Sequence, residues 1–132
     1  MSDIQNQIEE LWKSREGLSP GDSEANQVIH QAIDLLDQGK ARVAEPSQDG
    51  VIVNEWLKLA ILLLFKQAQM STIEAAPFEF ADKIPLKENY QQSGVRVVPG
   101  ALARWGSYLA PGVIMMPSFV NIGAWVGENT MV

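Results

Sequence analysis

The sequence predicts an α+β protein in which a mostly helical first part is followed by a β-solenoid of six-residue repeats. Apolar residues recur at helical spacing through the first half of the chain, whereas residues 97–132 keep three matched columns at a spacing of six. A helix has a period near 3.6 and a strand a period of two, so a spacing of six preserves strand alternation and leaves room for one bend per repeat. The period therefore predicts short strands joined by regular corners.

The repeat is built from a column of small residues, a column of apolar residues and a column of turn formers. Proline lacks the N–H group that a strand ladder needs, so the turn column belongs at corners, and we expect the apolar column to face a shared interior. An ordinary β-meander is the alternative, but it has no reason to keep these columns in register. The columns are Gly100, Gly106, Gly112, Ser118, Ala124 and Thr130; Leu102, Tyr108, Ile114, Val120, Val126 and Val132; and Pro99, Trp105, Pro111, Pro117, Gly123 and Asn129.

Composition excludes several classes of protein. The net charge is −6 and no basic cluster occurs, so we do not expect a nucleic-acid partner. The absence of cysteine excludes disulfides and cysteine-based zinc sites and suits a reducing cytoplasm, and no metal-ligand spacing is present. The polar, acidic N-terminus is not a secretory signal, and the longest apolar run, residues 59–65, is too short to cross a membrane.

Residues 1–70 are predicted to form a helical domain that includes a small hairpin. Apolar residues at positions 4, 8, 11 and 12 indicate a first, amphipathic helix. A second helix is predicted over residues 23–38 and a third over residues 55–69. The third helix is apolar on nearly every side, so we expect it at the buried centre of its domain.

The connections between these helices carry their own signals. Ser23 is predicted to be the N-cap of the second helix, and Gly39 stands just beyond its end. Residues 42–45 and 51–54 flank an Asp-Gly turn and are predicted to form the hairpin.

Residues 71–96 are predicted to be loop and linker. They contain Pro77, Pro85 and Gly94 and show no sustained period. The solenoid is then expected to begin with residues 97–132.

Arg96 interrupts the apolar column where that column is extended back by one repeat. A charged side chain is not expected in a dry solenoid interior, so we place the start of the repeat after Arg96 and Arg96 itself at the boundary between the two parts. Two interpretations remain open, a binding residue at this boundary or an exposed charge just before a strand. The pattern alone favours the exposed charge.

Other polar and aromatic residues point to structural roles. His30 is the only histidine and has no partner at a catalytic motif spacing, so we expect a surface or capping residue. Asp34 and Asp37 lie three positions apart on the predicted second helix and are expected on its solvated face. Trp105 and Trp125, within the repeat, could face a partner subunit.

With these residues placed, the chain resembles the N-terminal half of the tetrahydrodipicolinate N-succinyltransferases of bacterial lysine and diaminopimelate biosynthesis. The matching stretches are LLDQGKARVAE, VNEWLKLAILLLF, DKIPLK, GVRVVPGA and MPSFVNIGAWVGENTMV. Hexapeptide repeats occur in many acyltransferases, but their combination with this helical domain, with RVVP and with MPSFVNIGAWV is specific to this family.

The resemblance implies a cytoplasmic homotrimer that transfers a succinyl group from succinyl-CoA to the amine of tetrahydrodipicolinate. Ring opening by water then gives N-succinyl-2-amino-6-oxopimelate. Succinyl-CoA is a co-substrate in this reaction, and neither a bound cofactor nor a metal is expected. The resemblance also implies that residues 97–132 are the first coils of a left-handed parallel β-helix, with active sites between neighbouring subunits.

Two family residues concern the active site. The arginine of the family's RVVP motif binds a substrate carboxylate and matches Arg96, which replaces the interpretation that the pattern alone favours. The family's aspartate directly after TMV, a proposed general base, would follow Val132, the last residue of this sequence. The resemblance therefore implies Arg96 as the substrate-binding residue and no catalytic residue within residues 1–132.

The repeat region looks incomplete as a solenoid. Residues 97–132 would form about two triangular coils, whereas solenoids generally need three or more repeating units and a cap. We therefore expect these residues alone not to catalyse succinyl transfer. Two other functions remain open: a related hexapeptide acyltransferase with another acyl-CoA donor, and a non-catalytic trimerisation module.

Overall fold

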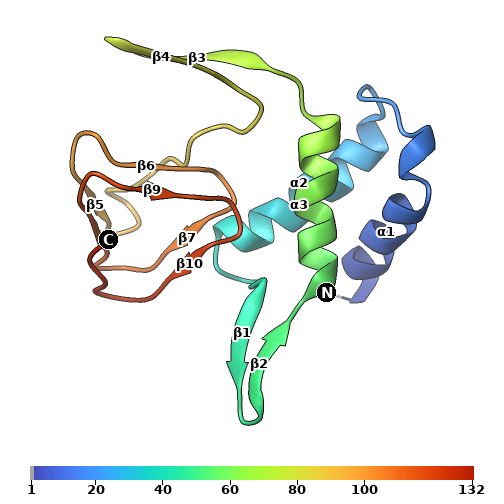
Figure 1. Ribbon diagram of the computed structural model, residues 1–132, viewed down its shortest axis with the longest axis horizontal. Helices are drawn as coiled ribbons and strands as arrows, with labels where there is room; N and C mark the ends of the chain where they lie inside the picture. Colours follow the sequence, from blue (N-terminus) through green and yellow to red (C-terminus); the bar gives the residue numbers. More distant parts are fainter. Residues whose placement is uncertain (1) are drawn as a thin grey trace.

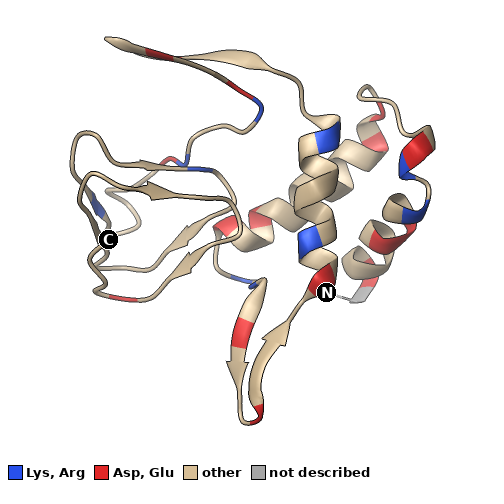
Figure 2. Ribbon diagram, in the orientation of Figure 1, with Lys and Arg blue, Asp and Glu red and all other residues tan. Residues whose placement is uncertain are grey.

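The computed structural model describes residues 2–132 and places three α-helices and ten short strands in a mixed α+β fold (Figure 1). The helices lie together, and the strands of the last third of the chain lie beside them. The predicted α+β class is confirmed. Figure 2 shows acidic and basic residues scattered along the chain rather than gathered in one segment. Within the described residues, no helix is long and apolar enough to span a membrane.

The three helices pack around one apolar core. α1 (Ser2–Lys13), α2 (Ser23–Asp37) and α3 (Glu55–Gln67) lie close to the predicted bounds, and a 3-10 turn (Arg15–Gly17) follows α1. Isoleucine and leucine side chains at helical spacing meet between them, and burial of each stabilises the fold by roughly 1.5–3 kcal/mol. The fully buried members are Ile8, Ile29, Ile33, Leu57 and Leu63.

Both ends of α2 are held by local contacts. Asp22 is the N-cap in place of the predicted Ser23, because its Oδ1 atom accepts a hydrogen bond from the backbone N–H of Ala25 at 3.0 Å. At the other end Gly39 adopts a φ of 72°, as predicted for the residue that follows a C-cap. A Cβ atom at Gly39 would lie 2.7 Å from the ring of Tyr108, so no side chain fits there.

α3 is less completely buried than its apolar sequence predicts. Leu62 is 52% exposed, whereas the polar Gln67 is buried. Gln67 is satisfied because its Nε2 atom donates to the backbone oxygen of Ser19 at 2.6 Å. α1 and α2 both pack against α3, but together they leave part of its apolar surface exposed.

The predicted hairpin is present and projects from the helices (Figure 1). β1 (Ala44–Ser47) and β2 (Gly50–Val53) form an antiparallel pair, and the bounds of both strands differ slightly from the prediction. Asn54 ties the base of the hairpin, since its Nδ2 atom donates to the backbone oxygen of Arg42 at 2.6 Å.

A second antiparallel hairpin lies within residues 71–96, which were predicted to be loop and linker. It consists of β3 (Ser71–Ala75) and β4 (Phe78–Asp82). The prediction is wrong here because each strand alternates over only five residues, and Pro77 in the turn interrupts the pattern between them. Proline is compatible with this position, which lies outside the ladder.

Residues 95–132, called the coil below, run through six short strands that pair in parallel. The chain returns beside itself after every third strand, as Arg96 pairs with Ile114, Leu102 with Phe119 and Tyr108 with Trp125. The strands are β5 (Arg96–Val97) with β8 (Ile114–Met115), β6 (Leu102–Ala103) with β9 (Phe119–Val120), and β7 (Tyr108–Leu109) with β10 (Trp125–Val126).

The interior of the coil is filled by a different column of residues from the one predicted. Ala103, Leu109 and Met115 are buried, whereas their preceding neighbours in the predicted column are only partly buried. Val120 and Val126 of the predicted column do pack into the interior, whereas Val132 is 37% exposed. The column changes because only four residues separate Met115 from Val120, one fewer than a strict period of six requires.

The coil packs against the helices through a close contact at Gly106. Ile84 and Ile122 extend the helical core toward the coil. Gly106 has a φ of 91°, and a Cβ atom there would lie 2.6 Å from Cγ1 of Ile122 and 2.9 Å from Cγ2 of Ile33. Glycine is therefore required at this position for both backbone conformation and space.

Candidate functional site

The coil presents an outward surface on each of its three strand pairs. On the β5–β8 pair, Arg96 lies beside Ile114, and Ile114 lies beside Met131 through a further parallel bridge. Val97 and Met115 point the other way, toward the interior, because side chains alternate along a strand. We call the surface formed by Arg96, Ile114 and Met131 the Arg96 face.

The backbone of Arg96 is held in the sheet while its side chain is exposed. Its N–H donates to the backbone oxygen of Val113 at 3.0 Å, and the N–H of Val98 donates to that of Met115 at 2.9 Å. Among residues 2–132 no carboxylate forms an ion pair with Arg96. The N–H donors of the guanidinium are therefore open to an external group, and their fork geometry suits a carboxylate.

Arg96 does not lie at the boundary between the helices and the coil. Figure 1 shows β5 on the side of the coil that faces away from the helices. The prediction placed Arg96 at the boundary because it assigned this residue to the interior column, whereas the register puts Val97 there. The repeat therefore includes Arg96 and does not begin after it.

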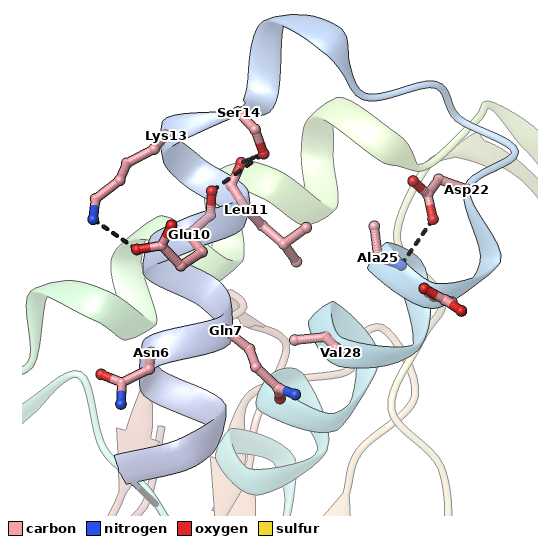
Figure 3. A pocket seen from close by; sticks show the side chains of 10 residues that line it. Asn6, Gln7, Glu10, Leu11, Lys13, Ser14, Asp22, Ala25 and Val28 are labelled. Atoms are coloured by element: carbon pink, nitrogen blue, oxygen red, sulfur yellow. Dashed lines mark hydrogen bonds and ion pairs between the residues drawn. The ribbon is translucent and has the colours of Figure 1, made fainter.

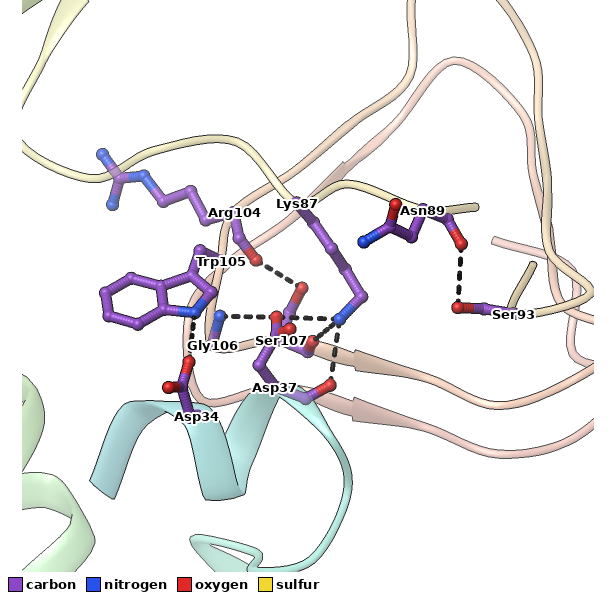
Figure 4. A network of polar contacts seen from close by, with 9 residues as sticks. All are labelled: Asp34, Asp37, Lys87, Asn89, Ser93, Arg104, Trp105, Gly106 and Ser107. Atoms are coloured by element: carbon purple, nitrogen blue, oxygen red, sulfur yellow. Dashed lines mark hydrogen bonds and ion pairs between the residues drawn. The ribbon is translucent and has the colours of Figure 1, made fainter. Parts of the chain in front are cut away.

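The boundary is held instead by Lys87 and Asp37 (Figure 4). Lys87 is only 9% exposed, and its Nζ atom donates to Oδ1 of Asp37 at 2.8 Å, to the backbone oxygen of Asp37 at 3.0 Å and to that of Ser107 at 2.7 Å. The same Oδ1 atom accepts the backbone N–H of Gly106 at 2.9 Å. All three ammonium donors are used, so this pair joins α2 to the coil and is not available to a substrate.

Asp34 and Asp37 were predicted to lie on a solvated face of α2, and the structure turns both toward the coil. Oδ1 of Asp34 accepts the indole N–H of Trp105 at 3.0 Å. The exposed ring of His30 meets Trp105 edge-on, with ring centroids 5.2 Å apart. His30 is thus a surface residue, as predicted, and Trp105 is engaged within the chain. A hollow of about 410 Å³ lies here, lined by His30, Asp37, Pro85, Leu86, Glu88, Asn89 and Trp105.

The other two outward surfaces carry arginines that already have partners. Arg104, beside the β6–β9 pair, donates from Nη2 to Oδ2 of Asp82 at 3.0 Å and from Nη1 to Oδ1 of Asn121 at 3.1 Å. Arg42 stacks its guanidinium over Trp125 of the β7–β10 pair, 4.0 Å from the ring centroid. Sequence reasoning missed both arginines because each depends on partners far along the chain.

Tyr90 packs against the coil interior and is half-buried. Burial raises the pKa of its hydroxyl above the usual 10.0, a hydrogen bond with the Ala103 backbone opposes this shift, and the charge of Asp37 adds to it. Tyr90 therefore stays protonated at neutral pH and is not a candidate base.

Another hollow, of about 620 Å³, lies between α1 and the start of α2 (Figure 3). Its polar groups serve the helices themselves: Lys13 pairs with Glu10 at 2.7 Å, and Asp22 caps α2. They do not converge on a ligand. Within residues 2–132 no group of three or more His, Cys, Asp or Glu side chains could hold a metal ion.

Comparison with known proteins supplies the family. The family described as "Tetrahydrodipicolinate N-succinyltransferase N-terminal" matches residues 3–66. Curated proteins named 2,3,4,5-tetrahydropyridine-2,6-dicarboxylate N-succinyltransferase match nearly the whole chain. The protein from Methylorubrum extorquens (strain PA1) is 44% identical, over 99% of this chain and 50% of that protein.

Two further relatives agree. The protein of the same name from Acinetobacter baylyi is 44% identical over 100% of this chain and 51% of its own length. The one from Bordetella petrii is 45% identical over 92% of this chain and 47% of its own length. The chain spans about half the length of the curated relatives it matches. It belongs to the tetrahydrodipicolinate N-succinyltransferase family and corresponds to the N-terminal half of its members.

Proposed function

We propose that this chain is part of an enzyme that transfers a succinyl group from succinyl-CoA to tetrahydrodipicolinate in lysine and diaminopimelate biosynthesis. The names of the relatives give the transferred group and the acceptor. In the reaction, water adds across the C=N bond of the cyclic acceptor, so that the ring nitrogen gains an N–H. This amine attacks the thioester carbonyl and loses its proton, the C–S bond breaks, and CoA leaves as the thiol. Cleavage of the ring C–N bond at the hydrated carbon then gives N-succinyl-2-amino-6-oxopimelate.

The open guanidinium of Arg96 is the observation in this chain that best supports the proposal. The acceptor is a dicarboxylate, and a guanidinium can hold one carboxylate through two parallel N–H···O bonds. Arg96 has its backbone fixed by the sheet and no carboxylate partner among residues 2–132. Its role is to bind and orient the substrate, so it is a binding residue rather than an acid or base.

The strand register supports a position close to Arg96 for the family's aspartate, the residue that would directly follow Val132. The pairing continues to the last residue described, since the N–H of Met116 donates to the backbone oxygen of Val132 at 2.9 Å. By strand alternation, an aspartate directly after Val132 would return to the outward side that holds Met131. Two strand spacings and two residues along the strand would put its Cα about 12 Å from that of Arg96, a separation that a long arginine side chain and a small substrate can span.

We also propose that the coil begins a left-handed parallel β-helix, distinct from a helical domain formed by residues 1–70. Three successive parallel pairings and an apolar residue facing inward on each strand support this architecture. The handedness follows from the family resemblance. So does our proposal of a cytoplasmic homotrimer that uses succinyl-CoA as co-substrate and carries no resident metal or cofactor.

An acyl-transfer assay tests the proposal. The protein is expressed at the length of its relatives, and CoA release is measured with tetrahydrodipicolinate as acceptor and either succinyl-CoA or acetyl-CoA as donor. We expect CoA release with a clear preference for succinyl-CoA. A preference for acetyl-CoA would instead identify a related acyltransferase, and no acceptor-dependent release with either donor would favour a non-catalytic trimerisation module. The inactivity of residues 1–132 alone stays a prediction, and the same assay checks it.

A further inference from the structure

Two apolar side chains follow Arg96 along the same outward surface. Ile114 pairs with Arg96 on the neighbouring strand, and Met131 pairs with Ile114 on the strand beyond. Ile114 is partly buried, and Met131 is 67% exposed. The Arg96 face is therefore a column of one cation and two apolar side chains.

The spacing of this column matches a small organic anion. Paired strands lie about 4.8 Å apart, so the three side chains stand at successive steps of this size. A carboxylate bound by the guanidinium would leave the remainder of its molecule beside Ile114 and Met131. Contact with these side chains is favourable only for an apolar remainder, because it removes apolar surface on both partners from water.

The other outward surfaces show what distinguishes this one. Each of the three has an arginine close to apolar or aromatic side chains. Arg104 is paired with Asp82, and Arg42 is stacked on Trp125. In the part of the chain that the structure describes, Arg96 has neither an ion pair nor a stacking partner, and its apolar neighbour Met131 is exposed.

We propose that Ile114 and Met131 form an apolar shelf beside Arg96, which selects carboxylates carried on an apolar ring or chain over small, fully hydrated carboxylates. The inference rests on the proposed function in one respect, that Arg96 is the carboxylate-binding residue. It adds two specificity-determining residues to that site. In this arrangement the apolar body of the ligand contacts Ile114 and Met131, and its carboxylate contacts Arg96.

Methyl NMR on this chain tests the shelf with two dianionic probes, pyridine-2,6-dicarboxylate, which has a planar ring, and malonate, which has a single methylene group. We expect the Met131 and Ile114 methyl signals to shift with the ring compound, and its Kd to be about five- to tenfold lower than that of malonate. Met131→Gln should reduce this ratio to near one while leaving the malonate Kd unchanged. Met70→Gln is the matched control, because Met70 is 61% exposed and lies outside the coil, and it should leave the ratio unchanged.

Arg96→Gln separates failure of the shelf from failure of the carboxylate site. If this variant loses both probes while Met131→Gln keeps the preference for the ring compound, the shelf is wrong and the carboxylate site stands. If Arg96→Gln binds both probes as tightly as the wild type, the carboxylate site fails and the shelf fails with it. Two further results would overturn the shelf: no binding of the ring compound to the wild type, or a Met131 signal that shifts with protein concentration alone, which would identify a contact between copies.

Discussion

Lys87 and Asp37 stand 50 positions apart in sequence, yet Nζ of Lys87 lies 2.8 Å from Oδ1 of Asp37. Both side chains are largely withdrawn from water, at 7% and 25% exposure. Their contact fixes the end of α2 against the coil, because Asp37 also accepts the backbone N–H of Gly106. This ion pair is therefore one of the contacts that fix the orientation of the coil relative to the helices.

Lys87→Ala should lower the free energy of unfolding by about 3 kcal/mol, since removing one partner leaves the other carboxylate half-enclosed and without its counter-charge. Urea unfolding followed by circular dichroism measures the loss. Lys58→Ala is the control, because Lys58 pairs with Glu55 at 3.0 Å but its side chain is 51% exposed, and we expect a loss below about 1 kcal/mol. Equal losses in the two variants would contradict the role given to Lys87.

Gly106→Ala should destabilise the protein by about 2–4 kcal/mol, because the added Cβ atom meets Ile122 and Ile33 and the backbone has a positive φ. Gly50→Ala separates the two causes, since Gly50 also has a positive φ, 124°, but its Cβ atom would meet nothing within 4 Å. That variant should lose only about 1 kcal/mol. Thermal unfolding of both proteins provides the comparison, and a smaller loss at Gly106 than at Gly50 would rule out the close contact.

Stability should fall as the pH rises above about 10, partly because of Tyr90. Its pKa is raised in the folded state, so the unfolded chain loses the phenolic proton at a lower pH than the folded chain does. The stabilisation is complete below the ordinary pKa of 10.0 and is lost as the pH rises through the higher folded value. In Tyr90→Phe this part of the alkaline loss should vanish, so the unfolding temperatures of variant and wild type should converge above pH 10. Parallel curves would contradict the assignment.

Arg104 is expected to hold the β3–β4 hairpin against the coil through Asp82. Both side chains are partly exposed, so a double-mutant cycle with Arg104→Gln and Asp82→Asn should give a coupling energy of about 1 kcal/mol. Each single variant should also speed hydrogen exchange of the β3 and β4 amides. Glu79→Gln, on the same hairpin, is the control and should leave hydrogen exchange unchanged. If exchange is also unchanged in Arg104→Gln, the Arg104–Asp82 ion pair does not hold the hairpin against the coil.

Local features of the fold could be predicted from the sequence because they depend on neighbouring residues. The three helices, the β1–β2 hairpin and the glycine after α2 all follow from periodicity and turn chemistry. The interior column of the coil was wrong at Leu102, Tyr108 and Ile114, because one repeat is a residue short and a strict grid hides that change. The observed pairings reveal the shift, because Arg96 pairs 18 positions on with Ile114, whereas Leu102 pairs 17 positions on with Phe119.

The candidate site could be predicted only in part, and for a different reason. Arg96 was identified through a resemblance, whereas the pattern alone favoured an exposed charge, and the structure does expose its side chain. The contacts of Lys87, Arg104 and Arg42 join residues far apart in sequence, and no local spacing reports such pairs. The Arg96 face likewise depends on the strand register, which brings Met131 to within two strands of Arg96.

Steady-state kinetics of Arg96→Gln test whether Arg96 binds a carboxylate of the acceptor, as we propose. The protein is expressed at the length of its relatives, with Arg15→Gln on the helical part as the matched control. We predict that Arg96→Gln raises KM for tetrahydrodipicolinate about tenfold to a hundredfold, equivalent to about 1.5–3 kcal/mol, with KM for succinyl-CoA unchanged. An acceptor KM equal to that of the wild type and of Arg15→Gln would contradict the claim.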